Sequence, residues 1–366
     1  MPKLFRESGP GLLLIGCTLI ALILANSSAH TWVEAIWQFP IFSGFTLKHS
    51  INEGIMTFFF LVVGLEIRHE LSSGHLASPS KAMLPVIAAL GGMIFPAIIY
   101  GLFNLGHPGL HGWGIPVATD IAFAVGILSM LGKKAPHAMK IFLTALAIAD
   151  DIGAMIILAF FYSQTLSWIY LGLATGLALS IWATRFWRKV PALVIIALGL
   201  GLWICLEHSG ISASLAGIIL AMSLPASCHH WEKQLSPWVQ WAIIPLFVLA
   251  NAGASLSGNL THLFEHRISL GIICGLVLGK PLGITLFSWV AVKMKVASLP
   301  THLGWNHMIG LGCLGGIGFT MSLFIAQLAF AQPEFLSLAT LSIPVASLLA
   351  TLLGFGVIYF SSYKGR

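Results

Sequence analysis

Runs of mostly apolar residues, each about as long as a bilayer is thick, recur along the whole chain and constrain its fold more than any other feature. Of the 366 residues only 8% are charged and 57% are hydrophobic, whereas a soluble domain carries about 25% charged residues. About 20 apolar residues suffice to cross a bilayer as a helix, and lipid offers the backbone no partners outside such a helix. The sequence therefore predicts an all-α polytopic membrane protein with about 12 transmembrane helices.

The predicted spans are joined by short linkers, with no soluble domain or low-complexity tract between them. We therefore expect a single integral membrane domain over residues 1–366, surrounded by the lipid bilayer. The expected spans are roughly 9–27, 52–67, 83–105, 114–132, 137–162, 166–184, 190–206, 210–225, 236–253, 268–291, 307–331 and 340–361.

Lysine and arginine alternate with these spans in a way that predicts the topology. With the N-terminus in the cytoplasm, fifteen of the 18 fall on the cytoplasmic side, only Lys48 and Arg267 fall outside, and Lys280 lies within a span. Positive charge is enriched in cytoplasmic loops, so we expect both termini in the cytoplasm. The net charge of +6 is then a sign of topology, and we expect no nucleic-acid partner.

The N-terminal segment also resembles a signal peptide. Lys3 and Arg6 precede the apolar run GLLLIGCTLIALILA, and LIGC resembles a lipoprotein cleavage box. Cleavage would leave the later topology unchanged. We expect this segment to be retained as the first helix.

Two of the expected spans are interrupted by glycine and proline. HGWGIPVATDIAFAVG (111–126) and IGLGCLGGIGFTMSLF (309–324) lie in the fourth and eleventh spans. Each is the middle of a three-helix group, and the two groups enter the membrane from opposite sides, which predicts inverted repeats over approximately 83–162 and 268–361. Paired interrupted helices of this kind indicate a transporter binding site, although membrane helices also tolerate glycine and proline for packing.

Three aspartates and one lysine lie deep inside the predicted spans, away from their ends. The chain has three aspartates in all, Asp120, Asp150 and Asp151, and each falls within a span, as does Lys280. A charge at the bilayer centre costs roughly 3 kcal/mol on insertion scales, so such residues are candidates for function. The alternative is a buried pair that fixes helix packing.

Helical geometry separates the possible roles of these acids. Adjacent residues point about 100° apart on a helix, so Asp150 and Asp151 cannot face each other as a dyad. With Asp120 and the hydroxyl of Thr119 they offer hard oxygen ligands, which suit alkali cations. A cation and protons would compete for these oxygens, as an ion/proton exchanger requires. The five cysteines and 14 histidines are scattered without metal-ligand spacing.

Further acids lie near the ends of spans. Glu66 lies in VVGLEIRHEL and Glu232 in WEKQLSPWV, beside His229 and His230. The spacing alone is explained if both are charged side chains that reach solvent at the membrane interface. Histidine near a membrane entrance would also suit a response to pH.

The chain resembles the NhaA family of sodium/proton antiporters over nearly its full length. The segments that carry this resemblance occur in the family order, and their combination is specific: VGLEIRHELSSG, GIPVATDIAFAVGIL, KIFLTALAIADDIGAMIILAFFY, IIPLFVLANAG, LVLGKPLGITLF and GGIGFTMSLFIAQLAF. The resemblance implies a twelve-helix inverted-repeat fold with two broken, crossing helices. It also implies a homodimer with a β-hairpin in the first outer loop, where WQFPIFSGFTLKHSIN (37–52) lies.

The resemblance also implies roles for single residues. Asp151 would be the principal ligand of Na⁺ or Li⁺, and Asp150 would exchange with it and pair with Lys280. Asp120 and Lys280 would compensate the partial charges of the half-helix ends, with Thr119 in the unwound stretch. Glu66 and Glu232 would belong to a pH-responsive cytoplasmic entrance.

The sequence departs from the family pattern at three places. Ser212 stands where the family often has histidine, Glu53 where an aspartate is typical, and the loop 224–235 is short. None of these changes touches the central acids. They leave the pH dependence open.

The function predicted by these features is Na⁺(Li⁺)/H⁺ antiport that extrudes sodium across a bacterial inner membrane, electrogenic and pH-regulated, without a cofactor and without enzymatic activity. A cation channel is an alternative, because polar residues at mid-membrane can also line a pore. An intramembrane aspartyl protease is another, since Asp120 and Asp150 come from separate helices, but the GxGD signature is absent.

Overall fold

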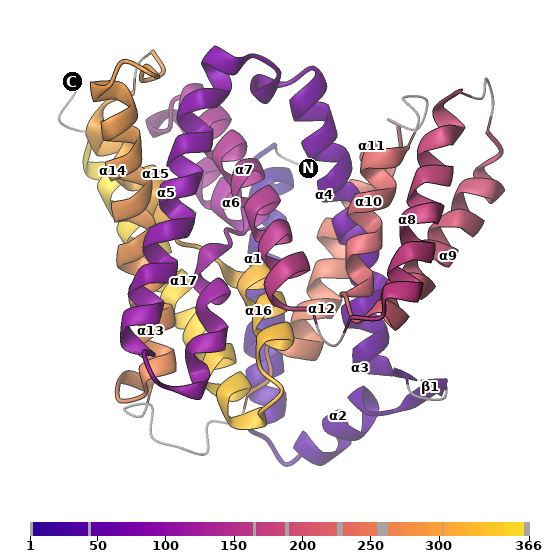
Figure 1. Cartoon of the computed structure of the whole chain (residues 1–366). Coiled ribbons are helices and arrows are strands. Elements are labelled where there is room, and N and C mark those ends of the chain that lie inside the picture. Colours follow the sequence, from indigo (N-terminus) through magenta and orange to yellow (C-terminus); the bar gives the residue numbers. More distant parts are fainter. Residues whose placement is uncertain are drawn as a thin grey trace. The chain divides into compact units, whose positions relative to one another are not determined.

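A computed structural model describes residues 3–42, 45–163, 166–186, 190–224, 230–254, 263–301 and 303–361. These residues are almost entirely helical (Figure 1), and their only strands are β1 (Pro40–Phe42) and β2 (Phe45–Thr46), which pair antiparallel. The all-α prediction is therefore confirmed. The weak strand signal in 37–52 does mark a short β-ladder. Residues 43 and 44, between its strands, lie outside the described residues.

Seven continuous helical stretches in the described residues are long and apolar enough to cross a membrane. They are Leu47–Ser72 (α3 Leu47–His49, η1 Ser50–Ile55 and α4 Met56–Ser72), α5 (Pro79–Phe103), α7 (His137–Phe161), Trp168–Phe186 (α8 Trp168–Ala183 and η5 Thr184–Phe186), α9 (Ala192–Ser209), Arg267–Lys293 (α13 Arg267–Cys274, η10 Gly275–Gly279 and α14 Lys280–Lys293) and α17 (Pro333–Ser361).

Three further pairs of helices satisfy the same criterion together but are bent at a short break. They are Gly9–Ala25 of α1 (Lys3–Ala25) with α2 (His30–Trp37), bent by 114°; η3 (Pro108–Val117) with α6 (Ile121–Met130), bent by 46°; and α15 (Trp305–Gly315) with α16 (Phe319–Ala329), bent by 45°. The last two pairs confirm the interruptions predicted in 111–126 and 309–324.

The remaining helices are shorter. They are η2 (His75–Ala77), η4 (Gly132–Lys134), η6 (Ala213–Leu215), α10 (Ala216–Ser223), α11 (His230–Trp238), η8 (Val239–Ile243) and α12 (Ile244–Asn251). Each of the twelve predicted spans therefore coincides with a helical stretch. Part of the short loop 224–235 lies outside the described residues, as do the side chains of Lys3 and Arg6.

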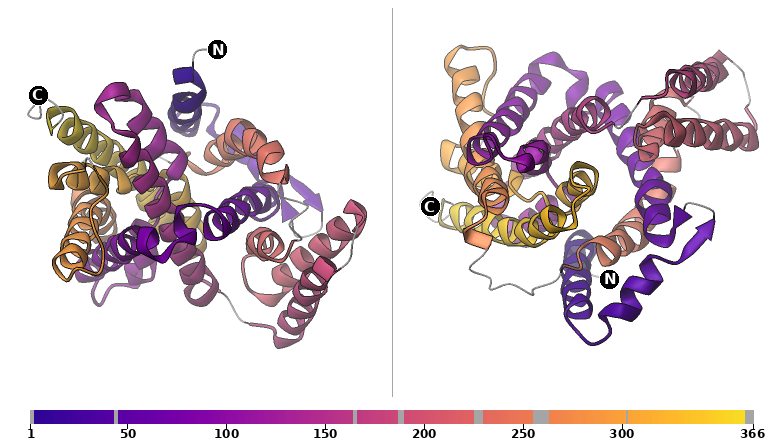
Figure 2. Two further views of the ribbon diagram at one scale, coloured as in Figure 1. Left: turned by 90° about the horizontal axis from the view of Figure 1, so that it is seen from above. Right: turned by 60° about the horizontal axis from the view of Figure 1, so that its bottom comes forward.

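The chain divides into two compact units, each built from separate stretches of sequence. The first comprises 1–29, 73–154 and 251–366, and the second comprises 30–72 and 155–250. In the first unit, α5 lies beside α13 and α14 (Figure 1). In the second, α8 and α9 lie side by side, as Figure 2 shows, and α10 packs against α4. The single domain and the inverted repeats stay predictions.

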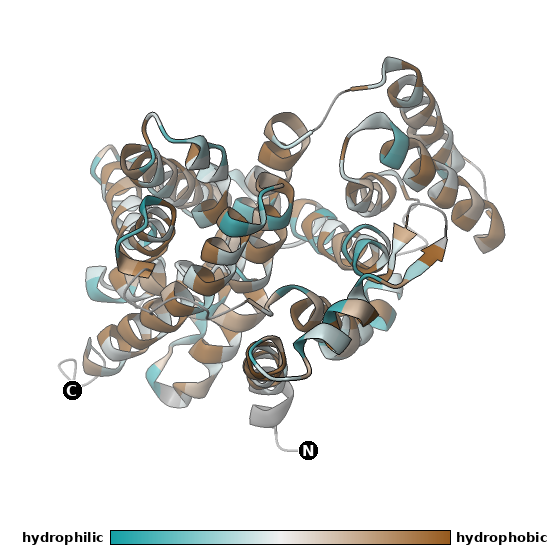
Figure 3. Ribbon diagram, turned by 90° about the horizontal axis from the view of Figure 1, so that it is seen from below, coloured by the Kyte–Doolittle hydropathy of each residue, from teal (hydrophilic) through white to brown (hydrophobic). Residues whose placement is uncertain are grey.

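Many large apolar side chains are exposed on helices of both units. The ribbon in Figure 3 shows that hydrophobic residues predominate along most of the helices. On the α8–α9 pair, for example, Trp168, Ile169 and Leu193 are each more than three-quarters exposed. A water-soluble protein rarely exposes a continuous apolar surface of this kind. It is the surface expected of helices that contact lipid.

Glycine allows α5 and α14 to touch through their backbones. A Cβ atom at Gly283 would lie 2.1 Å from the carbonyl oxygen of Gly91, and a Cβ at Gly91 would lie 2.2 Å from that of Gly283. Two glycines of η10, Gly275 and Gly279, lie against Pro116 and Pro96 in the same way. The contact of Gly275 with Pro116 also brings η10, which directly precedes α14, against η3.

We expect Gly283→Ala to destabilise the folded protein by about 1–3 kcal/mol, because the added methyl group forces two backbones apart. Thermal unfolding in detergent, followed by size-exclusion chromatography, would measure the effect. Gly172→Ala is the matched control, because a Cβ there has nothing within 4 Å. Equal melting temperatures for the two variants would contradict the prediction.

Candidate functional site

The side chains predicted to act inside the membrane are brought together in the first compact unit. Asp120, Asp150, Asp151, Thr119 and Lys280 are all buried. Asp150 and Asp151 lie in the middle of α7, Thr119 and Asp120 lie in the break before α6, and Lys280 is the first residue of α14. Three separate parts of the sequence therefore contribute to one polar cluster.

Lys280 and Asp150 form an ion pair at the centre of this cluster, through Nζ and Oδ2. Lys280 Nζ also donates to Thr119 Oγ1 at 2.9 Å. The single proton of the Thr119 hydroxyl has two acceptors within reach, Asp150 Oδ2 at 2.6 Å and the carbonyl oxygen of Gly315 at 2.8 Å. The hydroxyl thus connects the ion pair to the C-terminal end of α15, where the helix dipole is negative and favours a nearby cation.

Only one oxygen of Asp150 takes part in this network. Oδ1 is buried and accepts no hydrogen bond from the described residues. A buried carboxylate oxygen without a donor is costly, and such an atom in a folded protein calls for an explanation. A bound proton, water or cation at Oδ1 would supply one.

Asp151 follows Asp150 on α7 and is 2% exposed. It points in a different direction from Asp150, because one residue turns the helix by about 100°. Its charge nevertheless acts on Lys280. Lys280 therefore experiences both carboxylates while it is bonded to one of them.

Asp120 is shared between the N-terminal ends of two half-helices. Its Oδ1 accepts from the backbone N–H of Phe123 at 3.0 Å, at the start of α6. Its Oδ2 accepts from the N–H of Thr320 at 3.2 Å and from the Thr320 hydroxyl at 2.5 Å, at the start of α16. In addition, its own N–H donates to the carbonyl of Ile317 at 2.7 Å. The two breaks therefore meet at Asp120. A negative charge there is favourable, because it lies at the N-termini of two helices.

Three hydroxyl-bearing residues of this arrangement were not predicted from the sequence. Thr320 contacts Asp120, Ser322 Oγ donates to the carbonyl of Ile115 at 2.7 Å, and Ser347 Oγ accepts from Phe319 N–H at 3.3 Å. The signal available was the position of Thr320 and Ser322 directly after the glycines of the second break. Ser347 gave no such signal, because it lies in the middle of α17.

Glu66 and Glu232 belong to the second unit, whereas the three aspartates belong to the first. These two residues lie near each other. The charge of Glu232 therefore acts on Glu66, as does that of Glu70. Arg68, on the same helix, donates to the carbonyl of Ala221 at 3.3 Å. The neighbouring His229 lies outside the described residues.

The oxygen atoms of this cluster suit a small, hard cation better than a transition metal. Within the described residues, no three side chains of histidine, cysteine, aspartate or glutamate are grouped so as to hold a metal ion. Carboxylate, hydroxyl and carbonyl oxygens favour cations such as alkali ions. Such an ion would be a transported substrate.

Comparison with known proteins identifies the family of the chain. A family model described as Na⁺/H⁺ antiporter 1 matches residues 3–358. The chain belongs to this family. It is similar to Na(+)/H(+) antiporter NhaA 1 of Clostridium beijerinckii, with 44% identity over 99% of this chain and 95% of the relative. It is also similar to Na(+)/H(+) antiporter NhaA of Pseudomonas putida (41% identity, 98% and 97%) and of Vibrio alginolyticus (42%, 98% and 96%).

Membership of the Na⁺/H⁺ antiporter family confirms the resemblance that the sequence motifs indicated. The match runs through both broken helices and through α7. The relatives are named as antiporters, which are transporters and not enzymes.

We expect Thr320→Val to destabilise the protein by about 1.5–3 kcal/mol, because it removes a hydrogen bond to a charged acceptor. Thermal unfolding would measure this loss. Thr320→Ser keeps the hydroxyl and is the matched control, which should retain most of the stability. A valine variant as stable as the serine variant would show that the hydroxyl contributes nothing.

Proposed function

We propose that the chain is a Na⁺(Li⁺)/H⁺ antiporter whose exchange site is formed by Asp150 and Asp151. The observation that carries this proposal is the asymmetry of Asp150: Oδ2 is bonded by Lys280 and Thr119, whereas Oδ1 accepts no hydrogen bond from the described residues. A carboxylate in this arrangement is held by its cationic partner on one side and can bind a substrate ion on the other.

Competition for the carboxylate oxygens would couple the two ions. When Na⁺ or Li⁺ binds to the oxygens of these acids, its positive charge takes over the role of Lys280 and of any proton on the acids. When the cation leaves, protons and the Lys280 ammonium neutralise the acids again. Because two acids exchange for one monovalent cation, more than one proton can move per cation, which would make the exchange electrogenic.

The broken helices would give this site access to each side of the membrane in turn. The two interrupted pairs are bent by nearly the same angle, 46° and 45°, and they meet at Asp120. Such similarity supports inverted repeats over approximately 83–162 and 268–361, and crossing of the two breaks. Transporters of this class alternate access by movement of one repeat or bundle around a fixed site.

Asp120 and Thr119 would then position the site. Both oxygens of Asp120 accept bonds from the N-terminal turns of α6 and α16. This engagement argues against an aspartyl protease, in which the two acids must face each other and a water molecule. The buried Lys280 argues against an open channel, because a fixed cation repels cations from a continuous pore.

Glu66 and Glu232 are the groups we propose for the response to pH. They come from different helices, α4 and α11, and their like charges act on each other, which makes the contact between these helices sensitive to protonation. Glu232 lies within the shortened loop 224–235, so the pH range of activity is expected to differ from that of relatives with a longer loop.

The cellular setting follows from the same features. We propose a multi-pass protein of a bacterial inner membrane, with both termini in the cytoplasm and the short β-ladder on the outside. The β-ladder would support a homodimer. No cofactor and no nucleic acid are expected to take part.

We expect Asp151→Asn to abolish exchange. In inside-out vesicles from cells that lack their own sodium exporters, Na⁺ or Li⁺ should collapse a respiration-driven pH gradient, as reported by a pH-sensitive dye. The variant should lower this response at least about tenfold across the pH range, because a substrate interaction present in the transition state is lost. Glu34→Gln, which removes an exposed acid of α2, is the control and should leave the response unchanged. A full response in the Asp151 variant would overturn the proposed site.

The orientation can be tested at the two ends of a single helix. Arg267 and Lys293 are exposed at the ends of the Arg267–Lys293 stretch. In a chain without its five natural cysteines, Arg267→Cys should react in intact spheroplasts with a maleimide that cannot cross membranes, and Lys293→Cys should react only after lysis. The reverse pattern would place both termini outside.

A further inference from the structure

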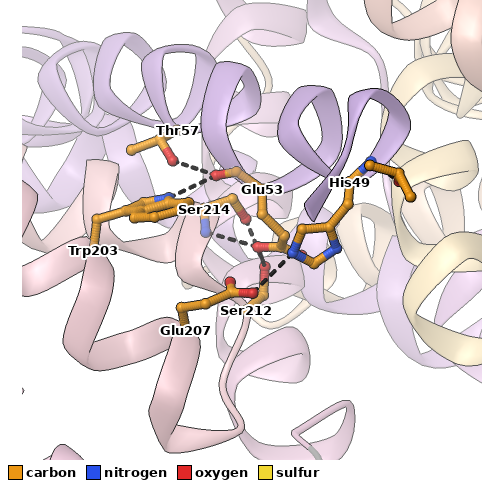
Figure 4. Close-up of polar contacts among 8 residues, drawn as sticks. His49, Glu53, Thr57, Trp203, Glu207, Ser212 and Ser214 are labelled. Atoms are coloured by element: carbon orange, nitrogen blue, oxygen red, sulfur yellow. Dashed lines mark hydrogen bonds and ion pairs between the residues drawn. The ribbon is translucent and has the colours of Figure 1, made fainter. Parts of the chain in front are cut away.

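A second cluster of ionisable side chains lies in the unit that does not contain the aspartates (Figure 4). It joins the beginning of the Leu47–Ser72 stretch to the end of α9 and to η6. Its ionisable members are His49, Glu53 and Glu207. The topology proposed above places these residues on the outer side of the membrane, so the inference below depends on that orientation.

Glu53 is held by two serines. It is 7% exposed, and its Oε2 accepts from the hydroxyl of Ser212 at 2.8 Å and from the N–H of Ser214 at 3.0 Å. Figure 4 shows the glutamate pointing toward these two residues. The carboxylate is thereby bonded, but by neutral donors alone.

The backbone of Glu53 is held separately, through a local irregularity of the helix. Residues Ser50–Ile55 form the π-helix η1, and such insertions leave carbonyl groups available for other partners. The carbonyl of Glu53 accepts from the indole N–H of Trp203 at 2.8 Å and from the hydroxyl of Thr57 at 2.6 Å. This attachment to α9 does not depend on protonation.

His49 joins the same region to α9 by a contact that does depend on protonation. Its Nε2 lies 2.8 Å from Oε1 of Glu207, and its ring meets that of Phe45 edge to face at 4.9 Å. The imidazole is 39% exposed, so protons from solution reach it. Histidine is the side chain whose charge ordinarily changes between pH 5 and 8.

The net charge of the cluster depends on whether the imidazole of His49 is protonated. The charges of Glu207 and His49 both act on Glu53, and those of Glu207 and Glu53 both act on His49. The neighbouring Lys48 faces Glu34 of α2 instead. In the described residues, then, the charged groups acting on His49 are two carboxylates. When His49 loses its proton, these like charges remain close together without a cation between them.

We propose that His49, Glu207 and Glu53 form a proton-binding site, apart from the exchange site, that reports external pH to the outer end of the Leu47–Ser72 helix. With His49 protonated, the ion pair with Glu207 holds the start of this helix against α9. As the external pH rises through the neutral range, the pair is lost and the two carboxylates repel each other. The bonds of Trp203, Ser212 and Ser214 to Glu53 then hold the helix without the ion pair at its start, and its first turns loosen.

Hydrogen–deuterium exchange of the full chain in lipid nanodiscs tests the local event without any transport. Between pH 6 and 8.5, after correction for the intrinsic rate with a peptide from the first unit, protection of residues 45–57 should fall at least about threefold, the size of effect expected for a partly exposed ion pair. His49→Gln should show the loosened state at every pH. Glu207→Gln should remove the change with pH, because repulsion between two carboxylates can no longer arise.

His208→Gln is the matched control, because this exposed neighbour faces Tyr170 and not the cluster. It should behave as the wild type does. Protection of 45–57 that is independent of pH in the wild type, or a His208 variant that mimics the His49 variant, would overturn the proposal.

The functional consequence is tested in right-side-out vesicles loaded with ²²Na⁺ at fixed internal pH. Dividing the rate of ²²Na⁺ efflux of His49→Gln by that of the wild type at the same external pH removes the effect of the driving force. This ratio should exceed about threefold near external pH 6 and approach one near pH 8.5. A ratio that stays constant with external pH would overturn the control of transport by this site. If neither the wild type nor any variant showed sodium efflux, while the hydrogen–deuterium exchange still changed with pH as expected, the proposed function would be contradicted instead.

Discussion

A buried lysine that keeps its charge inside a membrane protein needs a compensating partner, and in this chain Asp150 is in position to provide it. The other features of the first unit follow from it. The close contact of Gly91 with Gly283 brings α14 against α5, and Lys280 at the start of α14 is fully buried. Thr119 connects the pair to the carbonyl end of α15. A buried pair with one partner removed leaves an uncompensated charge, and this restricts what can replace either residue.

The two clusters of ionisable groups obey different physical rules. Around Lys280 the side chains are sealed from solvent, and electrostatic interactions are strong because little water screens them. Around His49 the imidazole is partly exposed, so the same kinds of charges interact more weakly and respond directly to the solution. The first environment suits selective binding of an ion, and the second suits sensing.

The sequence was sufficient to predict the helical fold and the positions of the breaks, because hydropathy and the glycine and proline residues act locally. It also identified Asp120 and Lys280 as unusual, since a charge within an apolar run stands out. It could not reveal Thr320 or Ser347 as partners, because serine and threonine are ordinary in membrane helices and their contacts join segments that are distant in the chain. The π-helix at Ser50–Ile55, and with it the role of Trp203, likewise has no pattern in the local sequence.

One link between the two broken helices is made without a side chain on either side. The N–H of Asp120 donates to the carbonyl of Ile317, so both partners are backbone atoms. Such a link does not depend on which amino acid occupies position 317, and the residue there can drift during evolution while the connection persists. Only proline at position 120 would delete the donor outright. The junction of the two half-helices can therefore persist through substitutions that change the residues around it.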